Sequence, residues 1–264
     1  MLSKALKLRG GIRELRWRAH RARWAFNSSN PLILNPEYAE DGIITNHIAY
    51  FLKDPNFLNA YRAAKETGAL LNHRGDIRWR AYINISFAKY ALKIQGDFVE
   101  CGVGKGLYSK AICEYLNFSS LDRSFHLIDT FSGIPISQLD ESEINTGQKF
   151  NSLAYKGSYL EEVKDTFRVY RNVEIHQGKL PDILNEISFL KGISYLQIDL
   201  NNANAEVATL DKLLSHCNPG GVIILDDFAY GREFELSYKL ITDFVNYKNL
   251  NIITIPTGQG LILV

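Results

Sequence analysis

The sequence predicts an α/β fold: a mostly parallel sheet with helices on its faces, preceded by a helical cap. From Gly96 onward, short apolar runs alternate with amphipathic stretches, which is the pattern of βαβ units. The last two runs, 251–255 and 261–264, are separated by the turn Pro256-Thr257-Gly258-Gln259-Gly260, which predicts an antiparallel hairpin. We therefore expect five parallel strands followed by a C-terminal antiparallel hairpin.

The composition is that of an ordinary globular protein. The 264 residues are 46% hydrophobic and 22% charged with a formal net charge of +1, so the molecule as a whole is not suited to polyanions. Three cysteines without CxxC spacing argue against a disulfide framework or a structural zinc site, and favour a reducing, cytoplasmic compartment. No apolar run reaches eighteen residues, so no transmembrane helix is expected.

Three regions differ in their sequence pattern. Residues 1–37 are predicted to form a basic arm and linker, because the first 25 residues contain eight Lys and Arg but one acid, Glu14. Leu, Ile and Trp are interleaved with these basic residues, which suits an arm that lies on an anionic membrane surface, at the inner face of the membrane. The same pattern suits an arm that packs within a homo-oligomer, and the sequence does not decide between the two. Nucleic acid is not expected as a partner, because no further basic and aromatic clusters follow.

Residues 38–95 are predicted to form a helical cap. Apolar residues recur at helical spacing in Ile44, Ile48, Phe51 and Leu52, and again over 82–92. Asp54-Pro55 marks the start of a helix. Residues 96–264 follow as the sheet domain, with strands expected at 97–101, 124–128, 172–176, 193–199 and 220–226. Its helices are expected near 106–117, 158–168, 180–190, 203–217 and 231–247.

The first strand runs into a glycine turn, Glu100-Cys101-Gly102-Val103-Gly104-Lys105-Gly106, and then into a helix. Such a turn lets a nucleotide-bearing cofactor approach the backbone. A carboxylate at Glu100 would repel the pyrophosphate of a nicotinamide cofactor, but it would attract the ammonium and sulfonium groups of S-adenosylmethionine. Ser109 and the helix N-terminus suit the carboxylate of the methionine part.

The second strand ends on Asp129, the position at which an acid binds ribose hydroxyls in doubly wound folds. The alternative is that Asp129 caps the following turn. Phe131, or the turn Gln177-Gly178 after the third strand, is a candidate for contact with the adenine.

Three aspartates follow later strands: Asp199 after the fourth, and Asp226 and Asp227 after the fifth. The carboxyl ends of parallel strands share one edge, so these acids should converge, and they would repel one another unless a cation or basic group lies among them. Oxygen ligands of this kind suit Mg²⁺, Ca²⁺ or Mn²⁺. Alternatively, the acids cap helices and turns. His47 and His73, in the cap, are candidates for a general base beside Asp199.

Several segments together resemble the macrocin O-methyltransferase family (the TylF/MycF type) of class I S-adenosylmethionine-dependent methyltransferases, over residues 38–264. They are GDFVECGVGKGLYSKAI, FHLIDTFSGIP, YLQIDLNNANAE, NPGGVIILDDFAYG and IPTGQGLILV, with EDGIITNHIAYFLKDPNFLNAY and GDIRWRAYI in the cap. The resemblance implies the Rossmann-like methyltransferase fold, S-adenosylmethionine as cofactor, and a divalent metal, usually Mg²⁺.

The resemblance, with the reasoning from strand ends, gives a set of candidate site residues. Cofactor-binding candidates are Glu100, Cys101, Gly102, Gly104, Gly106, Tyr108, Ser109, Asp129, Thr130, Phe131, Gln177, Gly178 and Asp199. Metal candidates are Asp199, Asp226 and Asp227, and catalytic candidates are Asp199, His47 and His73.

The chain departs from the family pattern after the fourth strand. The macrolide enzymes resemble IDxDxY there, whereas this chain has Ile198-Asp199-Leu200-Asn201-Asn202-Ala203, so Asn201 replaces the second acid. Asn202 stands where catechol-type relatives carry a lysine base.

The resemblance as a whole implies the function that we expect, which is Mg²⁺-dependent O-methylation of a hydroxyl. The acceptor would be a sugar, a glycoside, or a precursor of a polysaccharide or secondary metabolite. The alternatives are a non-catalytic cofactor-binding partner protein and an NAD-dependent oxidoreductase.

Overall fold

The computed structural model describes residues 36–69, 76–155, 157–188 and 191–264. Two compact units divide the chain, the first ending at Tyr50 and the second running from Phe51 to Val264. The basic arm predicted over 1–25 lies outside the described residues. Within the described part, no helix is both long enough and apolar enough to cross a membrane.

The first unit contains a β-hairpin where the sequence predicted helix. Strand β1 (Tyr38–Glu40) pairs antiparallel with β2 (Ile43–Thr45). Asp41 and Gly42 between them both have positive φ, 51° and 75°, as a two-residue hairpin turn of type I′ requires. The helical prediction is wrong for this segment, because Asp41-Gly42 is a turn signal that prevails over the spacing of Ile44 and Ile48.

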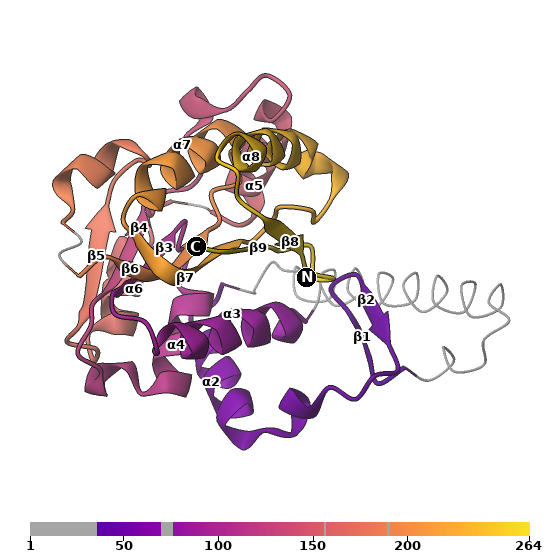
Figure 1. The fold of residues 1–264 in the computed structure, drawn as a ribbon, viewed down its shortest axis with the longest axis vertical. Coiled ribbons are helices and arrows are strands. Elements are labelled where there is room, and N and C mark those ends of the chain that lie inside the picture. Colours follow the sequence, from indigo (N-terminus) through magenta and orange to yellow (C-terminus); the bar gives the residue numbers. More distant parts are fainter. Residues whose placement is uncertain (1–35, 70–75, 156, 189–190) are drawn as a thin grey trace, which may run out of the picture. The chain divides into compact units, whose positions relative to one another are not determined.

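The second unit is built on a seven-stranded sheet of order β5-β4-β3-β6-β7-β9-β8 (Figure 1). The strands are β3 (Asp97–Cys101), β4 (Phe125–Asp129), β5 (Val173–Gln177), β6 (Ile193–Ile198), β7 (Cys217–Leu225), β8 (Ile252–Thr254) and β9 (Gly260–Leu263). Strands β3 to β7 are parallel, and β9 is antiparallel to both β7 and β8. The predicted five parallel strands and terminal hairpin are confirmed.

Helices cover both faces of this sheet (Figure 1). On one face lie α2 (Pro55–Glu66), α3 (Arg78–Ala91) and α4 (Leu107–Leu116), and on the other lie α7 (Ala203–Leu214) and α8 (Glu235–Tyr247). Helix α6 (Leu160–Phe167) packs beside β5, and α5 (Ile144–Leu153) lies in the segment between β4 and α6. Short 3-10 helices are η2 (Tyr50–Lys53), η3 (Phe118–Ser120), η4 (Ile136–Gln138), η5 (Asp182–Glu186) and η6 (Arg232–Phe234).

Two helical segments differ from expectation. The helix predicted over 180–190 is limited to η5, directly after Pro181, a residue that lacks a backbone N–H and restricts the residue before it. Helix α5 lies where the sequence suggested only loop, because its segment INTGQKFNSL contains few apolar side chains.

Alternation along the strands divides the core. Val99, Leu196 and Ile223 stand side by side in register and face the cluster completed by α7 and α8. On the opposite face Phe98 contacts the rings of Phe125 and Tyr195. Large side chains fixed on both faces hold the strand ends, and hence the loops after them, in defined positions.

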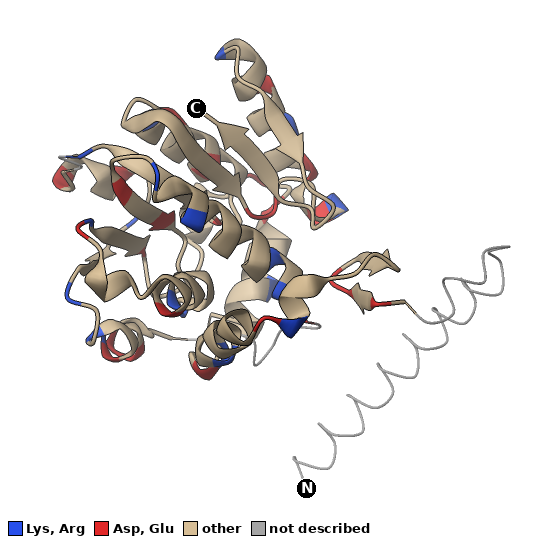
Figure 2. Cartoon of the chain, turned by 60° about the horizontal axis from the view of Figure 1, so that its bottom comes forward, with Lys and Arg blue, Asp and Glu red and all other residues tan. Residues whose placement is uncertain are grey.

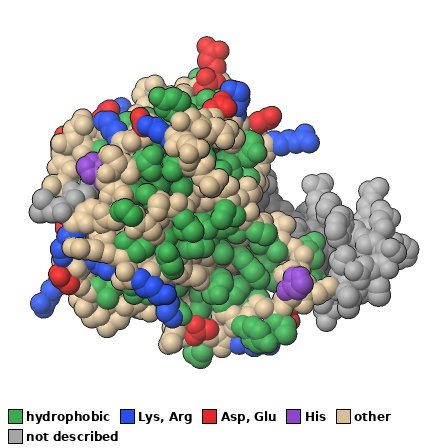
Figure 3. Space-filling view, viewed as in Figure 1, with side chains coloured by type: hydrophobic (Ala, Val, Ile, Leu, Met, Phe, Trp, Pro, Cys, Tyr) green, Lys and Arg blue, Asp and Glu red, His purple; other side chains and the backbone are tan. Residues whose placement is uncertain are grey.

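The surface of the described residues has no strong bias in charge. Basic and acidic positions are interspersed over the second unit (Figure 2). At the sheet edge formed by β8 and β9, Ile253 and Leu263 are exposed, and hydrophobic side chains gather across the middle of the face seen in Figure 3.

Candidate functional site

A cavity that is open to solvent lies at the carboxyl ends of the parallel strands. This is the edge at which open α/β sheets bind their ligands. Its lining comes from the turns after β3, β4, β5 and β6: Gly102, Gly104, Asp129, Thr130, Gly133, Ile134, Pro135, Gln138, Tyr155, Tyr159, Gly178, Leu180, Asp199, Leu200, Asn201, Asn202 and Ala205.

The glycine turn needs glycine for two separate reasons. Gly102 has φ +87°, and a Cβ there would collide with the backbone carbonyl of Asp199. Gly106 has φ +82° at the start of α4, where a Cβ would meet the ring of Phe167. Only a residue without a side chain combines these φ values with such close backbone approach. The result is bare backbone at Gly102 and Gly104 along one wall of the cavity.

Asp129 braces this turn from the neighbouring strand. Its Oδ2 accepts a hydrogen bond from the Gly104 N–H at 2.8 Å, and its Oδ1 accepts one from the Phe131 N–H at 2.6 Å. Burial nevertheless raises the pKa of the Asp129 carboxyl, although these hydrogen bonds oppose the shift. The capping role of Asp129 is therefore real, and the residue also lines the cavity.

Glu100 is a buried acid with an unsatisfied oxygen. The residue is 1% exposed, and its Oε2 has no hydrogen-bond partner. Burial raises its pKa to about 8, and the nearby carboxylates of Asp226 and Asp129 add to the shift while Ser109 opposes it. An isolated carboxyl of this kind is costly unless a cationic group joins it.

The three aspartates converge as predicted. One oxygen each of Asp199, Asp226 and Asp227 lies within 4.8 Å of the others. The basic group among them is Arg80 of α3, whose Nη1 lies 2.6 Å from Asp226 Oδ2 and 3.2 Å from Asp227 Oδ1. Arg80 is 4% exposed, and its guanidinium stacks 4.0 Å from the ring of Tyr230. The chain thus supplies its own cation to the acid cluster.

These residues as placed do not fit a divalent metal ion. Asp226 already accepts on both oxygens: Oδ2 from Arg80 and from the Tyr108 hydroxyl at 3.2 Å, and Oδ1 from Gln259 Nε2 at 2.8 Å. A Mg²⁺ ion needs near-octahedral access to free oxygens, and the guanidinium stands between Asp226 and Asp227. Arg80 would have to leave before a metal could use both residues.

Asp199 is the member of the cluster that lines the cavity. Burial raises its pKa well above the ordinary value, and repulsion from Asp226 and Asp227 adds to the shift, with Arg80 opposing it. Its Oδ1 accepts a hydrogen bond from Asn201 Nδ2 at 3.0 Å. Asn201, the substituted second acid, is therefore a neutral donor that orients Asp199.

Some predicted site residues do not line the cavity. Phe131 is fully buried, packs edge-on against Tyr159 and does not line the cavity, so nothing in this geometry supports its predicted contact with the adenine. Cys101 is buried in the strand core, where desolvation raises the pKa of its thiol well above the usual range. Gln177 does not line the cavity, and its Nε2 donates a hydrogen bond to the Thr130 carbonyl. Its neighbour Gly178 does line the cavity. Tyr108 and Ser109 are buried in α4, and Tyr108 reaches Asp226.

Neither histidine candidate lies among the described residues of the second unit, which contains the cavity. His47 belongs to the first unit and is exposed, with its backbone N–H bonded to Thr45 Oγ1. His73 lies outside the described residues. Among the catalytic candidates, Asp199 alone is described at the cavity.

Sequence reasoning missed three contributors. Tyr155 and Tyr159 line the cavity from the segment after α5, and burial raises the pKa of both hydroxyls above the usual range, so both stay protonated donors. No motif marks them. Arg80 had a usable signal, because three convergent acids require a cation and the cap contains Arg78 and Arg80.

Comparisons with known proteins agree with this fold. The family model described as macrocin O-methyltransferase (TylF) matches residues 80–256. Similar solved structures include the O-methyltransferase NovP (21% identity, 70% of this chain and 78% of that one, TM-score 0.59). A second is the calicheamicin methyltransferase CalS11, with 14% identity over 80% of this chain and 93% of that one and a TM-score of 0.60. A third is the O-methyltransferase TomG from Streptomyces achromogenes, with 15% identity over 80% of this chain and 90% of that one and a TM-score of 0.50. At these identities the structures show a shared fold. The comparison with curated proteins finds no match.

Proposed function

Since the chain belongs to the macrocin O-methyltransferase (TylF) family, we propose that it transfers the methyl group of S-adenosylmethionine to a hydroxyl group of a sugar. The observation that carries the proposal is a cavity walled by glycine backbone at Gly102 and Gly104, with the buried, unsatisfied Glu100 two residues before Gly102 in the chain. A ligand that carries positive charge and tolerates close backbone contact fits both features. The solved structure of TomG is a complex with S-adenosylmethionine, which supports this choice.

The cofactor would use residues from three strand ends. Glu100 would receive the ammonium group, and its pKa would fall as the ion pair forms. Asp129, held by Gly104 and Phe131, would accept hydrogen bonds from the ribose hydroxyls. Gly178 and Leu180, on the opposite wall, would flank the adenine.

The acceptor would bind beside Asp199, near the hydroxyl of Tyr155, which also faces that carboxylate. Tyr155 remains protonated, so it would donate a hydrogen bond to a sugar oxygen. A further solved structure of CalS11 describes it as a TDP-rhamnose 3'-O-methyltransferase, which supports a sugar as acceptor and gives a first compound to test.

The reaction would be an in-line displacement. The acceptor oxygen attacks the methyl carbon, the bond from carbon to sulfur breaks, and neutral S-adenosylhomocysteine leaves. The hydroxyl proton passes to Asp199, whose raised pKa suits a general base better than an ordinary aspartate. Holding oxygen, carbon and sulfur in line would supply much of the rate.

Arg80 would hold the charge of Asp226 and Asp227 in place of a metal, so no step requires a divalent ion. The Mg²⁺ predicted from the family pattern remains testable. If an ion does take part, adding Mg²⁺ must strengthen cofactor binding or activity, and chelation must remove the effect.

The test is calorimetric titration of S-adenosylhomocysteine, with and without Mg²⁺, on the wild type, Asp129→Ala and the exposed control Asp122→Ala. We expect micromolar binding by wild type and control, weakened at least tenfold in Asp129→Ala and unchanged by Mg²⁺. Transfer of labelled methyl to TDP-rhamnose then tests the acceptor class. A folded wild type that binds neither S-adenosylhomocysteine nor S-adenosylmethionine would refute the proposal.

A further inference from the structure

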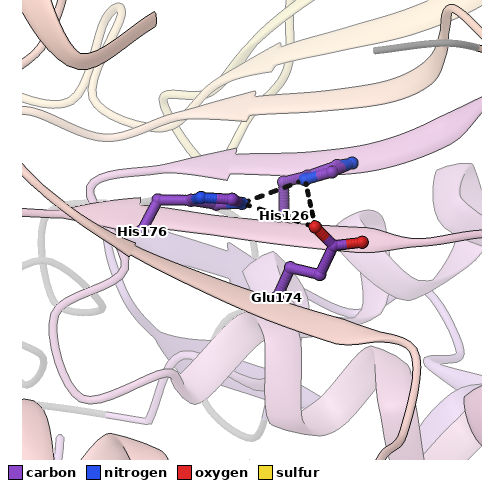
Figure 4. A group of neighbouring side chains, drawn as sticks. All are labelled: His126, Glu174 and His176. Carbon is purple, nitrogen blue, oxygen red and sulfur yellow. Dashed lines mark hydrogen bonds and ion pairs between the residues drawn. The ribbon is translucent and has the colours of Figure 1, made fainter. Parts of the chain in front are cut away.

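Two histidines and a glutamate meet on neighbouring strands, at the edge of the sheet formed by β5. His126 of β4 stands opposite Glu174 of β5, and His176 follows two residues later on the same face of β5. The three side chains point toward one another (Figure 4). His126 Nδ1 lies 3.1 Å from His176 Nε2, and Glu174 Oε2 lies 3.7 Å and 4.0 Å from these two nitrogens. None of the three residues lines the cavity described above.

These distances match the spacing of ligands around one transition-metal ion. The point equidistant from the corners of a triangle with these three sides lies about 2.1 Å from each corner, which is the usual length of Zn–N and Zn–O bonds. That point lies in the plane of the three atoms, so the side chains must draw slightly closer together before the ion can take a tetrahedral position with a fourth ligand. Two imidazole nitrogens and a carboxylate oxygen also form a familiar ligand set for zinc, which leaves a fourth position for water.

An outer partner holds Glu174 in this orientation. The Ser124 hydroxyl donates to Glu174 Oε1 at 2.8 Å, which turns Oε2 toward the histidines. On the far side of His126, the Asp97 carboxylate lies 3.9 Å from Nε2, beyond hydrogen-bond distance, and Asp97 is itself fixed by the Ser124 N–H at 2.9 Å. In zinc sites a carboxylate commonly stands behind a histidine that binds the metal.

Burial and charge suit metal binding as well. His126 is buried, while Glu174 is 49% exposed and gives an ion a path from solvent. The carboxylates of Glu174 and Asp97 bring negative charge to both sides of the histidine pair.

We propose that His126, Glu174 and His176 form a binding site for a zinc-type divalent ion, separate from the cavity at the carboxyl edge of the sheet. The ion would tie the edge strand β5 to β4, and so fix the strand from which Gly178 and Leu180 follow. Without a metal, the same residues would form only a hydrogen bond between two rings, and the experiment separates the two cases.

The test uses the full chain, without a histidine tag, after dialysis against a chelator. Zn²⁺ is titrated by calorimetry and Co²⁺ by visible absorption. We expect one site with micromolar or tighter affinity, d–d bands of four-coordinate Co²⁺, and a melting temperature that rises by several degrees with metal. His176→Gln and Glu174→Gln should each weaken binding at least tenfold, whereas the exposed control His216→Gln should not.

Two results would overturn the proposal. The first is wild-type protein that binds neither ion more tightly than millimolar. The second is a tight site that survives His176→Gln and Glu174→Gln, particularly if Asp227→Asn removes it, because the ion would then lie in the acid cluster. Neither result depends on methyltransferase activity, so this proposal and the proposed function fail separately.

Discussion

The guanidinium of Arg80 lies 2.6 Å from the carboxylate of Asp226, which joins the first turn of α3 to the end of β7 across 146 residues of sequence. Both side chains are buried. The pair gives the acid cluster a fixed positive charge, and it also limits how far α3 can move from the sheet. The stability of the fold and the electrostatics of the cavity therefore depend on the same contact.

Arg80→Met should destabilise the protein by about 3–5 kcal/mol, because it leaves two buried carboxylates without their cation. Urea unfolding at pH 7.5 measures the loss. The control is Arg78→Met, whose ion pair with Asp76 is half-exposed and is expected to be worth less than about 1 kcal/mol. Arg80→Met also tests whether Arg80 occupies the position that a metal ion would take. If it does, Mg²⁺ should raise the stability of Arg80→Met but not that of the wild type. Equal stabilisation of both would show that Arg80 does not occupy the position of an ion.

Gly102→Ala should abolish binding of S-adenosylhomocysteine and cost more stability than the φ value alone explains. At Gly102 a Cβ meets the Asp199 carbonyl, whereas at Gly157, which has φ +73°, nothing lies within 4 Å. Gly157→Ala therefore measures the backbone cost alone, about 1 kcal/mol. We expect Gly102→Ala to exceed this by 1 kcal/mol or more in thermal unfolding. Similar losses in the two variants would mean that the turn can relax around a methyl group.

The stability of the ligand-free protein should fall as pH rises from about 4.5 to about 8. Glu100 and Glu206 both have pKa values of about 8 in the folded protein against an ordinary value of 4.5. Over this window the folded state binds more protons than the unfolded state, so each group lowers stability by up to about 1.4 kcal/mol per pH unit.

Urea unfolding at several pH values measures how the free energy of unfolding depends on pH. In Glu100→Gln the contribution of Glu100 to this dependence should disappear, while the contribution of Glu206 should remain. Saturating S-adenosylhomocysteine should also flatten the dependence, because its ammonium group favours charged Glu100. A pH profile that Glu100→Gln leaves unchanged would contradict the raised pKa.

Asp199→Asn should lower kcat about 10²- to 10⁴-fold, as expected for loss of a general base. Affinity for S-adenosylhomocysteine should change little, which separates a lost proton acceptor from a damaged cofactor site. In the wild type kcat should rise with pH as Asp199 loses its proton, and the midpoint should lie above the ordinary aspartate range. A variant with undiminished kcat would move the base elsewhere, with His47 and His73 as the remaining candidates.

Much of the fold could be predicted because the signals are local. Asp97–Cys101 and Phe125–Asp129 are short apolar runs bounded by turn residues, and their strand ends fix where Gly102, Gly104 and Asp129 lie. The hairpin Tyr38–Thr45 was missed because the spacing of Ile44, Ile48 and Phe51 also fits a helix, although Asp41-Gly42 is a turn signal.

Sequence alone therefore determined the strand and helix pattern, the glycine turn, and the convergence of Asp199, Asp226 and Asp227. Each follows from the spacing of neighbouring residues and from the shared edge of parallel strands. Only the tertiary structure decided that Arg80 fills the acid cluster, that Phe131 turns into the core, and that His126 meets His176. Those outcomes depend on how segments that are distant in sequence pack against one another. Because the side chains compete for the same buried partners, no local sequence pattern predicts which contacts form.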